Sequence, residues 1–251
     1  MKTYSPDKIL YPCFIQPKLN GIYAELGTDG IFRSRTGKIF PAIQETWRDG
    51  MYSGEHCIRG ELWFPTFSLQ DTVSAVMPDK PGKDSCLVRY YAFDCGDLDI
   101  PQYKRFELLK DLEYLPLTYD RFYRVETYLI RSQKDGNACY EYFLKLGYEG
   151  AVYRPYSYGD LLKRKPFKDA EFECVAVHEG LGKRKGHVGN FTLRLNENKT
   201  FNCGGGRVSY KVLQELFRHP PIGKMITVRY QHTSDAGIPL CAQFIAVRNY
   251  E

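Results

Sequence analysis

The fold is decided by the stretch Cys13-Phe-Ile-Gln-Pro-Lys-Leu-Asn-Gly-Ile-Tyr-Ala-Glu25. An apolar run ends at Lys18, and an alternating run begins at Ile22. Asn-Gly between two strand-like runs is typical of a tight β-hairpin turn, so we expect a hairpin at Asn20-Gly21. The turn would hold the Lys18 amine at the end of a strand. A lysine that is desolvated near other cations is more readily neutral, and a neutral amine is a nucleophile. An ordinary surface lysine before a hairpin is the alternative.

The composition is that of a globular chain without a membrane segment. The 251 residues are 43% hydrophobic and 15% aromatic, which suits one large domain or two modest ones. No apolar stretch reaches about 18 residues, and the N-terminus lacks the layout of a signal peptide. The eight cysteines include no Cys-x-x-Cys pair, and the five histidines show no ligand spacing. We therefore expect no zinc site and no membrane partner, and an intracellular, cytoplasmic protein with reduced thiols.

Positive charge is concentrated in the last third of the chain. The formal net charge is +5, and residues 170–251 hold 11 Lys and Arg against 7 Asp and Glu. A basic second half fits a polyanionic partner such as nucleic acid. Ordinary solvated charge is the alternative explanation of so small a surplus.

Hydrophobic patterning predicts two domains, residues 1–168 and 169–251. In the first, strands and helices do not alternate strictly, which predicts an α+β fold with antiparallel sheets. The expected strands cover residues 14–17, 22–26, 30–34, 57–64, 87–93, 121–125, 150–154 and 161–165, and the expected helices 68–77, 103–114 and 132–146. In the second, short strands at 172–178, 190–195, 200–202, 225–230 and 243–248, with one helix at 210–217, predict an OB-fold barrel.

Five more motifs follow the Lys18 stretch in order. They are Ser34-Arg-Thr-Gly37, Gly60-Glu-Leu-Trp63, Tyr91-Ala-Phe-Asp94, Glu149-Gly-Ala-Val-Tyr-Arg154 and Leu162-Lys-Arg-Lys165. Together with Lys18-Leu-Asn-Gly21, they resemble the nucleotidyltransferase motifs of ATP-dependent polynucleotide ligases, a superfamily that includes mRNA-capping enzymes. The chain looks most like the minimal DNA ligases of viruses and phages. The resemblance implies a nucleotidyltransferase (adenylation) domain followed by an OB-fold domain.

The resemblance also implies a chemistry for Lys18. Its amine would attack the α-phosphate of ATP, expel pyrophosphate and carry AMP as a lysyl-AMP adduct. AMP would pass to a DNA 5′-phosphate, and the 3′-hydroxyl across the nick would then displace it. Lys163 and Lys165 alternate along a strand and would contact the α-phosphate, unless they form only a solvated basic edge.

The other implied nucleotide contacts are Ile15, Gln16, Arg35, Glu61, Phe93 and Glu149. By resemblance, Phe93 stacks on adenine, and Arg35 reaches the ribose or the DNA 5′-phosphate. Glu149 and Glu61 would hold Mg²⁺ or Mn²⁺ against the phosphates. Each residue has a plainer alternative, namely a core phenylalanine, turn residues for Arg35 and Glu149, and an exposed acid at a strand entrance for Glu61.

Two glycine-rich loops carry cations in the second domain. Gly180-Leu-Gly-Lys-Arg-Lys-Gly-His-Val-Gly189 contains Lys183, Arg184 and Lys185, and Gly204-Gly-Gly-Arg-Val-Ser209 places Arg207 before a helix capped by Ser209. Glycines let a backbone approach phosphates, and cations neutralise them. We expect these four cations to bind DNA with Arg35, although a solvated, flexible loop has the same composition.

Three positions depart from the family pattern. Asn20 replaces the usual aspartate, Tyr23 stands where many members have arginine, and Arg248 lacks the usual following lysine. We expect a monomer that seals 5′-phosphate/3′-hydroxyl nicks in duplex DNA, with ATP and a divalent cation as cofactors. The alternatives are an RNA ligase, a capping-type nucleotidyltransferase, or an inactive OB-type nucleic-acid-binding module.

Overall fold

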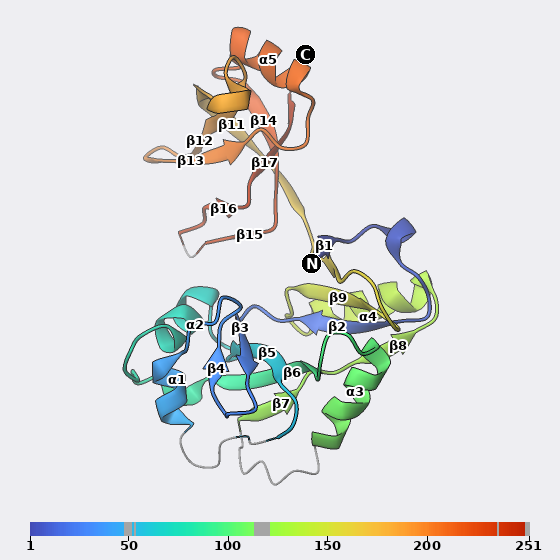
Figure 1. Cartoon of the computed structure of the whole chain (residues 1–251). Helices are drawn as coiled ribbons and strands as arrows, with labels where there is room; N and C mark the ends of the chain where they lie inside the picture. Colours follow the sequence, from blue (N-terminus) through green and yellow to red (C-terminus); the bar gives the residue numbers. More distant parts are fainter. Residues whose placement is uncertain (48–51, 53, 113–120, 235, 249–251) are drawn as a thin grey trace. The chain divides into compact units, whose positions relative to one another are not determined.

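The computed structural model describes the chain except for residues 48–51, 53, 113–120, 235 and 249–251. The chain divides into two compact units, Met1–Arg164 and Lys165–Glu251 (Figure 1). This division lies four residues before the boundary expected between residues 168 and 169.

The first unit contains two five-stranded sheets. The first sheet has the order β1 (Lys2–Thr3), β10 (Leu162–Arg164), β9 (Gly150–Pro155), β2 (Cys13–Lys18) and β8 (Tyr128–Ile130). The second has the order β4 (Phe32–Arg33), β3 (Ile22–Leu26), β5 (Ile58–Trp63), β6 (Arg89–Cys95) and β7 (Phe122–Arg124). The α+β class is confirmed. The expectation of antiparallel sheets holds for most pairs, but β1–β10 and β6–β7 are parallel.

The predicted hairpin at Asn20-Gly21 is wrong. Strand β2 pairs with β8 and β9, whereas β3 pairs with β4 and β5, so this turn carries the chain from one sheet to the other. The glycine is required for another reason. A Cβ on Gly21 would lie 2.7 Å from the Leu62 carbonyl oxygen and 2.8 Å from Trp63 Cβ. Gly21 therefore allows the turn to approach β5 closely, which a local turn signal cannot indicate.

Helices cover both sheets of the first unit (Figure 1). They are α1 (Pro41–Thr46), α2 (Leu69–Val76), α3 (Gln102–Asp111) and α4 (Gln133–Lys145), with short 3-10 helices η1 (Pro6–Lys8) and η2 (Ser85–Leu87). Ser132 caps α4 as predicted, because its side chain accepts a hydrogen bond from Asp135 N. Helix α3 packs on β6, and α4 packs on β2 and β9. The end of the predicted helix 103–114 lies partly outside the described residues. Helix α1 and strands β1 and β8 were not predicted.

The second unit is built on a closed five-stranded barrel. Its order is β11 (Lys168–Glu179), β12 (Val188–Asn196), β13 (Lys199–Gly204), β17 (Gln243–Val247) and β14 (Met225–Tyr230), with α5 (Tyr210–Arg218) between β13 and β14. A 3-10 helix η4 (Gly182–Arg184) and a ribbon of β15 (His232–Thr233) and β16 (Pro239–Leu240) complete it. Leu213 of α5 joins the barrel core with Phe191 and Ile226. The OB-fold prediction is confirmed. Among the described helices, none is long and apolar enough to cross a membrane.

Candidate active site

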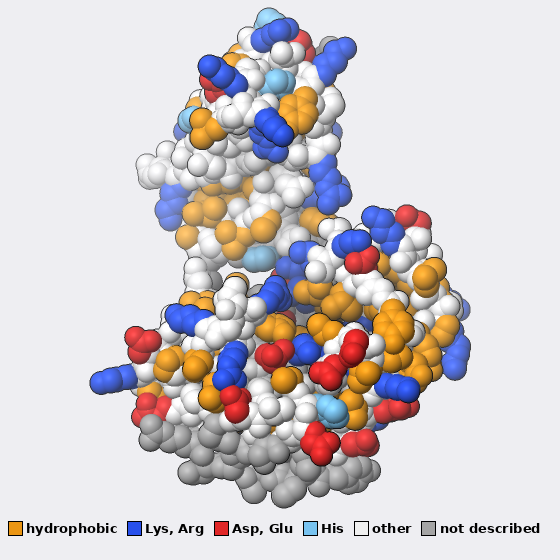
Figure 2. All heavy atoms as spheres, in the orientation of Figure 1, with side chains coloured by type: hydrophobic (Ala, Val, Ile, Leu, Met, Phe, Trp, Pro, Cys, Tyr) orange, Lys and Arg blue, Asp and Glu red, His pale blue; other side chains and the backbone are white. Residues whose placement is uncertain are grey.

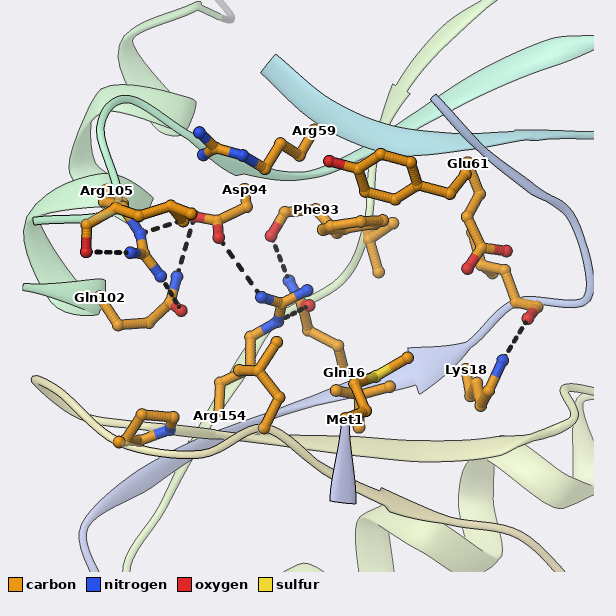
Figure 3. A pocket seen from close by; sticks show the side chains of 18 of the residues that line it. Met1, Gln16, Lys18, Arg59, Glu61, Phe93, Asp94, Gln102, Arg105 and Arg154 are labelled. Carbon is orange, nitrogen blue, oxygen red and sulfur yellow. Dashed lines mark hydrogen bonds and ion pairs between the residues drawn. The ribbon is translucent and has the colours of Figure 1, made fainter. Parts of the chain in front are cut away.

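A cavity of about 610 Å³ in the first unit is lined by residues of both sheets (Figure 3). Strands β2 and β9 contribute Gln16, Lys18 and Arg154, and the second sheet contributes Glu61 and Phe93. Its volume lies within the range of small-molecule sites, and the mixture of a ring, cations and a carboxylate is typical of them. The cavity therefore gathers several residues that the sequence singled out.

Strand alternation decides which predicted residues face this cavity. Gln16 lies opposite Val152 on β9, and Val152 lies opposite Lys163 on β10. Residues directly opposite one another share a face of the sheet, so Lys163 points to the cavity side. Ile15 points to the other side, where it is fully buried in the core that includes Tyr153. The Ile15 side chain therefore cannot contact a nucleotide in this cavity, and only its backbone could do so.

Lys18 and Glu149 are brought together at the edge of the cavity. Lys18 Nζ lies 2.6 Å from Glu149 Oε2, and the two side chains are 13% and 14% exposed. The Glu149 backbone N–H donates to the Lys18 carbonyl oxygen at 3.0 Å, which fixes the two residues side by side. A nearby carboxylate favours the charged form of the amine, unlike the nearby cations that would favour the neutral form.

Glu61 is tied to the turn that follows Lys18. Its Oε2 accepts a hydrogen bond from the Gly21 backbone N–H at 2.9 Å. Within the described part of the chain, no group of three or more His, Cys, Asp and Glu side chains could hold a metal ion. Mg²⁺ is commonly held by one or two carboxylates together with substrate phosphates and water. Glu61 and Glu149 fit a cation of that kind, and not a cage made of protein ligands alone.

Aromatic rings and arginines alternate along one wall of the cavity. The Arg154 guanidinium carbon lies 4.8 Å from the centre of the Phe93 ring. The Phe93 and Tyr23 rings are 6.2 Å apart, and the Arg35 guanidinium carbon lies 4.8 Å from the Tyr23 ring. The predicted residues Phe93 and Arg35 both line the cavity. Tyr23 connects them.

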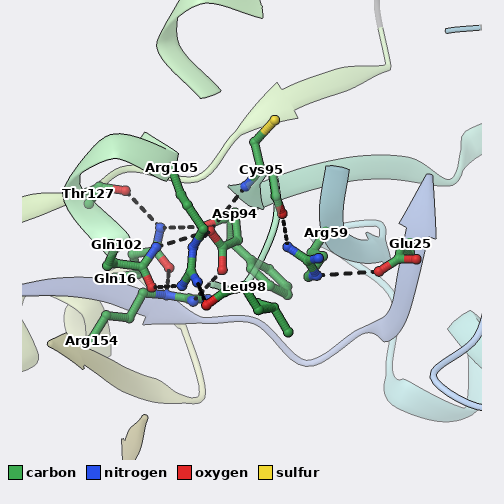
Figure 4. A network of polar contacts seen from close by, with 12 residues as sticks. Gln16, Glu25, Arg59, Asp94, Cys95, Leu98, Gln102, Arg105, Thr127 and Arg154 are labelled. Carbon is green, nitrogen blue, oxygen red and sulfur yellow. Dashed lines mark hydrogen bonds and ion pairs between the residues drawn. The ribbon is translucent and has the colours of Figure 1, made fainter. Parts of the chain in front are cut away.

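A buried polar network lies beside this wall (Figure 4). Asp94 accepts hydrogen bonds at 3.0 Å from both Gln102 and Arg105, and at 3.4 Å from Arg154. Burial lowers the pKa of Arg154 to about 10, against the opposing effect of the Asp94 charge. Asp94 and Arg154 each end one of the sequence motifs, but the motifs alone predicted no role for either residue. The available signal was an arginine in an otherwise apolar strand, since a buried charge needs a partner.

Gln16 belongs to the same network. Its side-chain oxygen accepts from Arg154 Nε at 2.5 Å, and its amide nitrogen donates to the Phe93 carbonyl oxygen and to Thr127 Oγ1. Gln16 is 1% exposed. Its polar atoms are thus already bound by protein groups, and they fix the backbone beneath the Phe93 ring.

The other predicted residues belong to the second unit. Strand β10 ends at Arg164, so the alternation that predicted a shared face for Lys163 and Lys165 stops before Lys165. Lys183, Arg184, Lys185 and Arg207 are all exposed. Figure 2 shows Lys and Arg side chains at several places on the visible face of this unit. The Arg248 side chain donates to Glu171 Oε1 at 2.7 Å.

Comparisons with known proteins agree with this architecture. A family model described as a DNA ligase OB-like domain matches residues 179–248. A DNA ligase of African swine fever virus, from the tick isolate Pretoriuskop, is 30% identical over 189 residues, which is 66% of this chain and 45% of the viral protein. The solved structure of a Lig E DNA ligase matches 98% of this chain and 97% of its own, with a TM-score of 0.80 and 26% identity. The chain is related to DNA ligases.

A bacterial relative supports the same relationship to DNA ligases. The DNA ligase of Haemophilus influenzae is 28% identical over 199 residues, which is 74% of this chain and 70% of that protein. The chain spans about half the length of the viral DNA ligases that it matches. The resemblance stated from the motifs is confirmed, as is the order of a nucleotidyltransferase domain followed by an OB-fold domain.

Proposed function

We propose that the protein is an ATP-dependent DNA ligase, which seals nicks in duplex DNA through a lysyl-AMP intermediate. One observation carries the proposal. In a chain related to DNA ligases, a shielded lysine lies at the edge of a cavity with its amine 2.6 Å from a carboxylate. A covalent intermediate divides a difficult condensation into easier transfers.

Lys18 would be the nucleophile. Its amine leaves the ion pair with Glu149, gives up a proton to water and attacks the α-phosphorus of ATP. A phosphorus–nitrogen bond forms as the bond to pyrophosphate breaks, and pyrophosphate departs with the electron pair. An oxygen of the nick 5′-phosphate then attacks the AMP phosphorus as the phosphorus–nitrogen bond breaks, and the lysine amine leaves and takes up a proton from water. The 3′-hydroxyl finally attacks the 5′-phosphorus, loses its proton to water and displaces AMP.

The cavity suits a nucleotide in volume and in lining. Phe93 would offer a ring face for adenine, over a backbone that Gln16 fixes. The backbone of Ile15 would supply the further nucleotide contact that the family resemblance implies. Lys163 and Lys165 would balance negative charge on the α-phosphate, and Arg35 would bind a further phosphate. A bound Mg²⁺ or Mn²⁺ would neutralise phosphate charge, with Glu149 and Glu61 as its protein ligands.

The DNA partner would be gripped through its backbone. Lys183, Arg184, Lys185 and Arg207 are exposed cations in glycine-containing loops of an OB fold. Contacts of this kind bind phosphates without reading sequence, as an enzyme that seals any nick requires.

A two-step gel experiment tests the function. The protein is incubated with radiolabelled ATP or GTP, and the adduct is chased with nicked DNA, nicked RNA or single-stranded RNA ends. We expect label on the protein from ATP alone and fastest joining of nicked DNA. An adduct formed from GTP would favour a capping-type enzyme, faster joining of RNA would favour an RNA ligase, and no adduct would favour an inactive binding module.

A further inference from the structure

Arg35 is an exposed cation whose position depends on one ring. It lies in the turn Ser34-Arg-Thr-Gly37, and its side chain lines the cavity. Among the described residues, its guanidinium contacts the Tyr23 ring, whose centre lies 4.8 Å from the guanidinium carbon. A long arginine side chain loses considerable rotamer freedom when it is fixed, so an unheld guanidinium would sample many positions.

Tyr23 is itself well fixed. It lies on β3 opposite Glu61, and its ring is tilted by 44° against the Phe93 ring at 6.2 Å. Burial, followed by the nearby Glu25 charge, raises the pKa of the Tyr23 hydroxyl, so the ring is neutral at physiological pH. The Tyr23 ring is therefore an uncharged group, packed near Phe93, that the Arg35 guanidinium contacts.

Arg154, at the other end of the same wall, provides a comparison. Its guanidinium lies equally close to a ring, 4.8 Å from Phe93, but it is also bound by Asp94 and Gln16. Arg154 would keep its place without the ring. The Arg35 guanidinium lies 4.8 Å from the Tyr23 ring and forms no ion pair with a carboxylate of the described residues, so the cation–π contact is what restrains it.

We propose that Tyr23 is a positioning residue, which holds the Arg35 guanidinium over the cavity to bind a phosphate oxyanion. The proposal rests on the proposed function. Tyr23 would not contact the phosphate and would contribute only by positioning Arg35. Tyr23 carries no charge, but its ring holds the positively charged side chain of Arg35, which belongs to the neighbouring turn. Because the guanidinium is preset, less conformational entropy is lost when the phosphate binds.

A double-mutant cycle tests this role. Tyr23→Leu, Arg35→Ala and the double variant are compared in adduct formation from ATP and in sealing of a nick that already carries AMP. Each single substitution should reduce kcat/KM of the same step about tenfold. Tyr23→Leu removes the cation–π contact that positions the guanidinium, and Arg35→Ala removes the guanidinium itself. If Tyr23 acts through Arg35, the double variant loses no more than Arg35→Ala alone. Losses that multiply in the double variant would overturn the proposal.

Two further variants exclude a merely structural effect. Tyr23→Phe keeps the ring and should retain kcat/KM within about twofold of wild type. Tyr103→Leu removes another half-buried ring, which stacks on Tyr156 outside the cavity, and should leave both steps unchanged. A Tyr23→Phe variant as defective as Tyr23→Leu would overturn the role of the ring.

The two assays distinguish this proposal from the proposed function. A loss confined to adduct formation identifies the phosphate as that of the nucleotide, and a loss confined to sealing identifies it as that of the nick. If wild-type protein forms no adduct with ATP, the proposed function fails. If wild type forms the adduct and seals DNA while Tyr23→Leu equals wild type, only the role of Tyr23 fails.

Discussion

Lys18 Nζ and Glu149 Oε2 form an ion pair of 2.6 Å in which both side chains are largely shielded from water. The backbone also holds the pair together, since the N–H of Glu149, which directly precedes β9, donates to the carbonyl oxygen of Lys18 at the end of β2. The amine cannot attack a phosphate while it is bound to this carboxylate. In the proposed reaction, Glu149 would serve as a ligand of the divalent cation, and the Lys18 amine would have to be free of this ion pair.

Lys18→Ala should form no AMP adduct, because this amine is the proposed nucleophile. The same variant should still seal a nick that already carries AMP, since the final displacement needs no lysine nucleophile. Lys18→Arg should also form no adduct, because a guanidinium stays protonated at any working pH. Labelled ATP followed by gel electrophoresis measures the first step. An adduct in Lys18→Ala would show that another residue carries AMP.

Glu149→Ala should reduce adduct formation by roughly a hundredfold, as is typical when one electrostatic group is removed from a transition-state site. Raising the Mg²⁺ concentration should not restore the rate, because both the metal ligand and the partner of Lys18 are lost. Glu141→Ala, an exposed carboxylate of α4, is the matched control and should be as active as wild type. If excess Mg²⁺ restored the full rate of adduct formation to Glu149→Ala, Glu149 would serve only as a residue of the turn.

Local signals predicted the elements, but not the contacts between distant segments. The caps of α4 and α5 at Ser132 and Ser209 could be predicted because capping depends on residues three positions apart. The Asn20-Gly21 hairpin failed because a turn signal does not specify which sheet each flanking strand joins. Asp94 and Arg154 are 60 residues apart, so no pattern in either segment indicates their contact.

The order of the motifs was enough to identify Lys18, Glu61, Phe93 and Glu149 as candidate site residues. The structure places all four at or beside one cavity. The ion pair of Lys18 with Glu149 was still not predicted, because the motifs give no distances. The functional roles of these residues stay predictions.

Gly21→Ala should slow adduct formation and destabilise the first unit by about 1–3 kcal/mol, the usual cost of forcing an extra carbon into a packed site. The new Cβ would lie 2.7 Å from the Leu62 carbonyl oxygen, which is backbone and cannot turn away. Gly82→Ala is the control, since its Cβ would meet nothing closer than Ser85 Oγ at 3.9 Å. Thermal unfolding of both variants, beside adduct rates, checks the prediction. Equal melting temperatures would show that the turn can move away from β5.

Replacing Lys183, Arg184 and Lys185 together by glutamine should weaken binding to nicked duplex DNA and flatten its salt dependence. Each phosphate contact that is lost removes roughly 0.9 from the slope of log K against log salt. Arg229→Gln is the control, because Asp169 already neutralises that arginine through bonds of 2.7 and 2.8 Å. Adduct formation with free ATP should change little. An unchanged slope in the triple variant would place this loop away from the DNA.

Asp94→Asn should destabilise the first unit strongly, by about 3 kcal/mol or more, because it leaves Arg105 and Arg154 buried without their countercharge. Asp29→Asn is the contrasting variant in the same unit. It breaks a bidentate pair with Arg33 whose side chains are 49% and 33% exposed, so solvent screening should keep its cost below about 1 kcal/mol. Urea unfolding at neutral pH measures both. Because Arg154 also supports Gln16 beneath Phe93, Asp94→Asn should raise the KM for ATP at temperatures where it remains folded, whereas Asp29→Asn should not. Equal costs for the two substitutions would mean that water reaches the Asp94 network and that it does not fix the floor of the cavity.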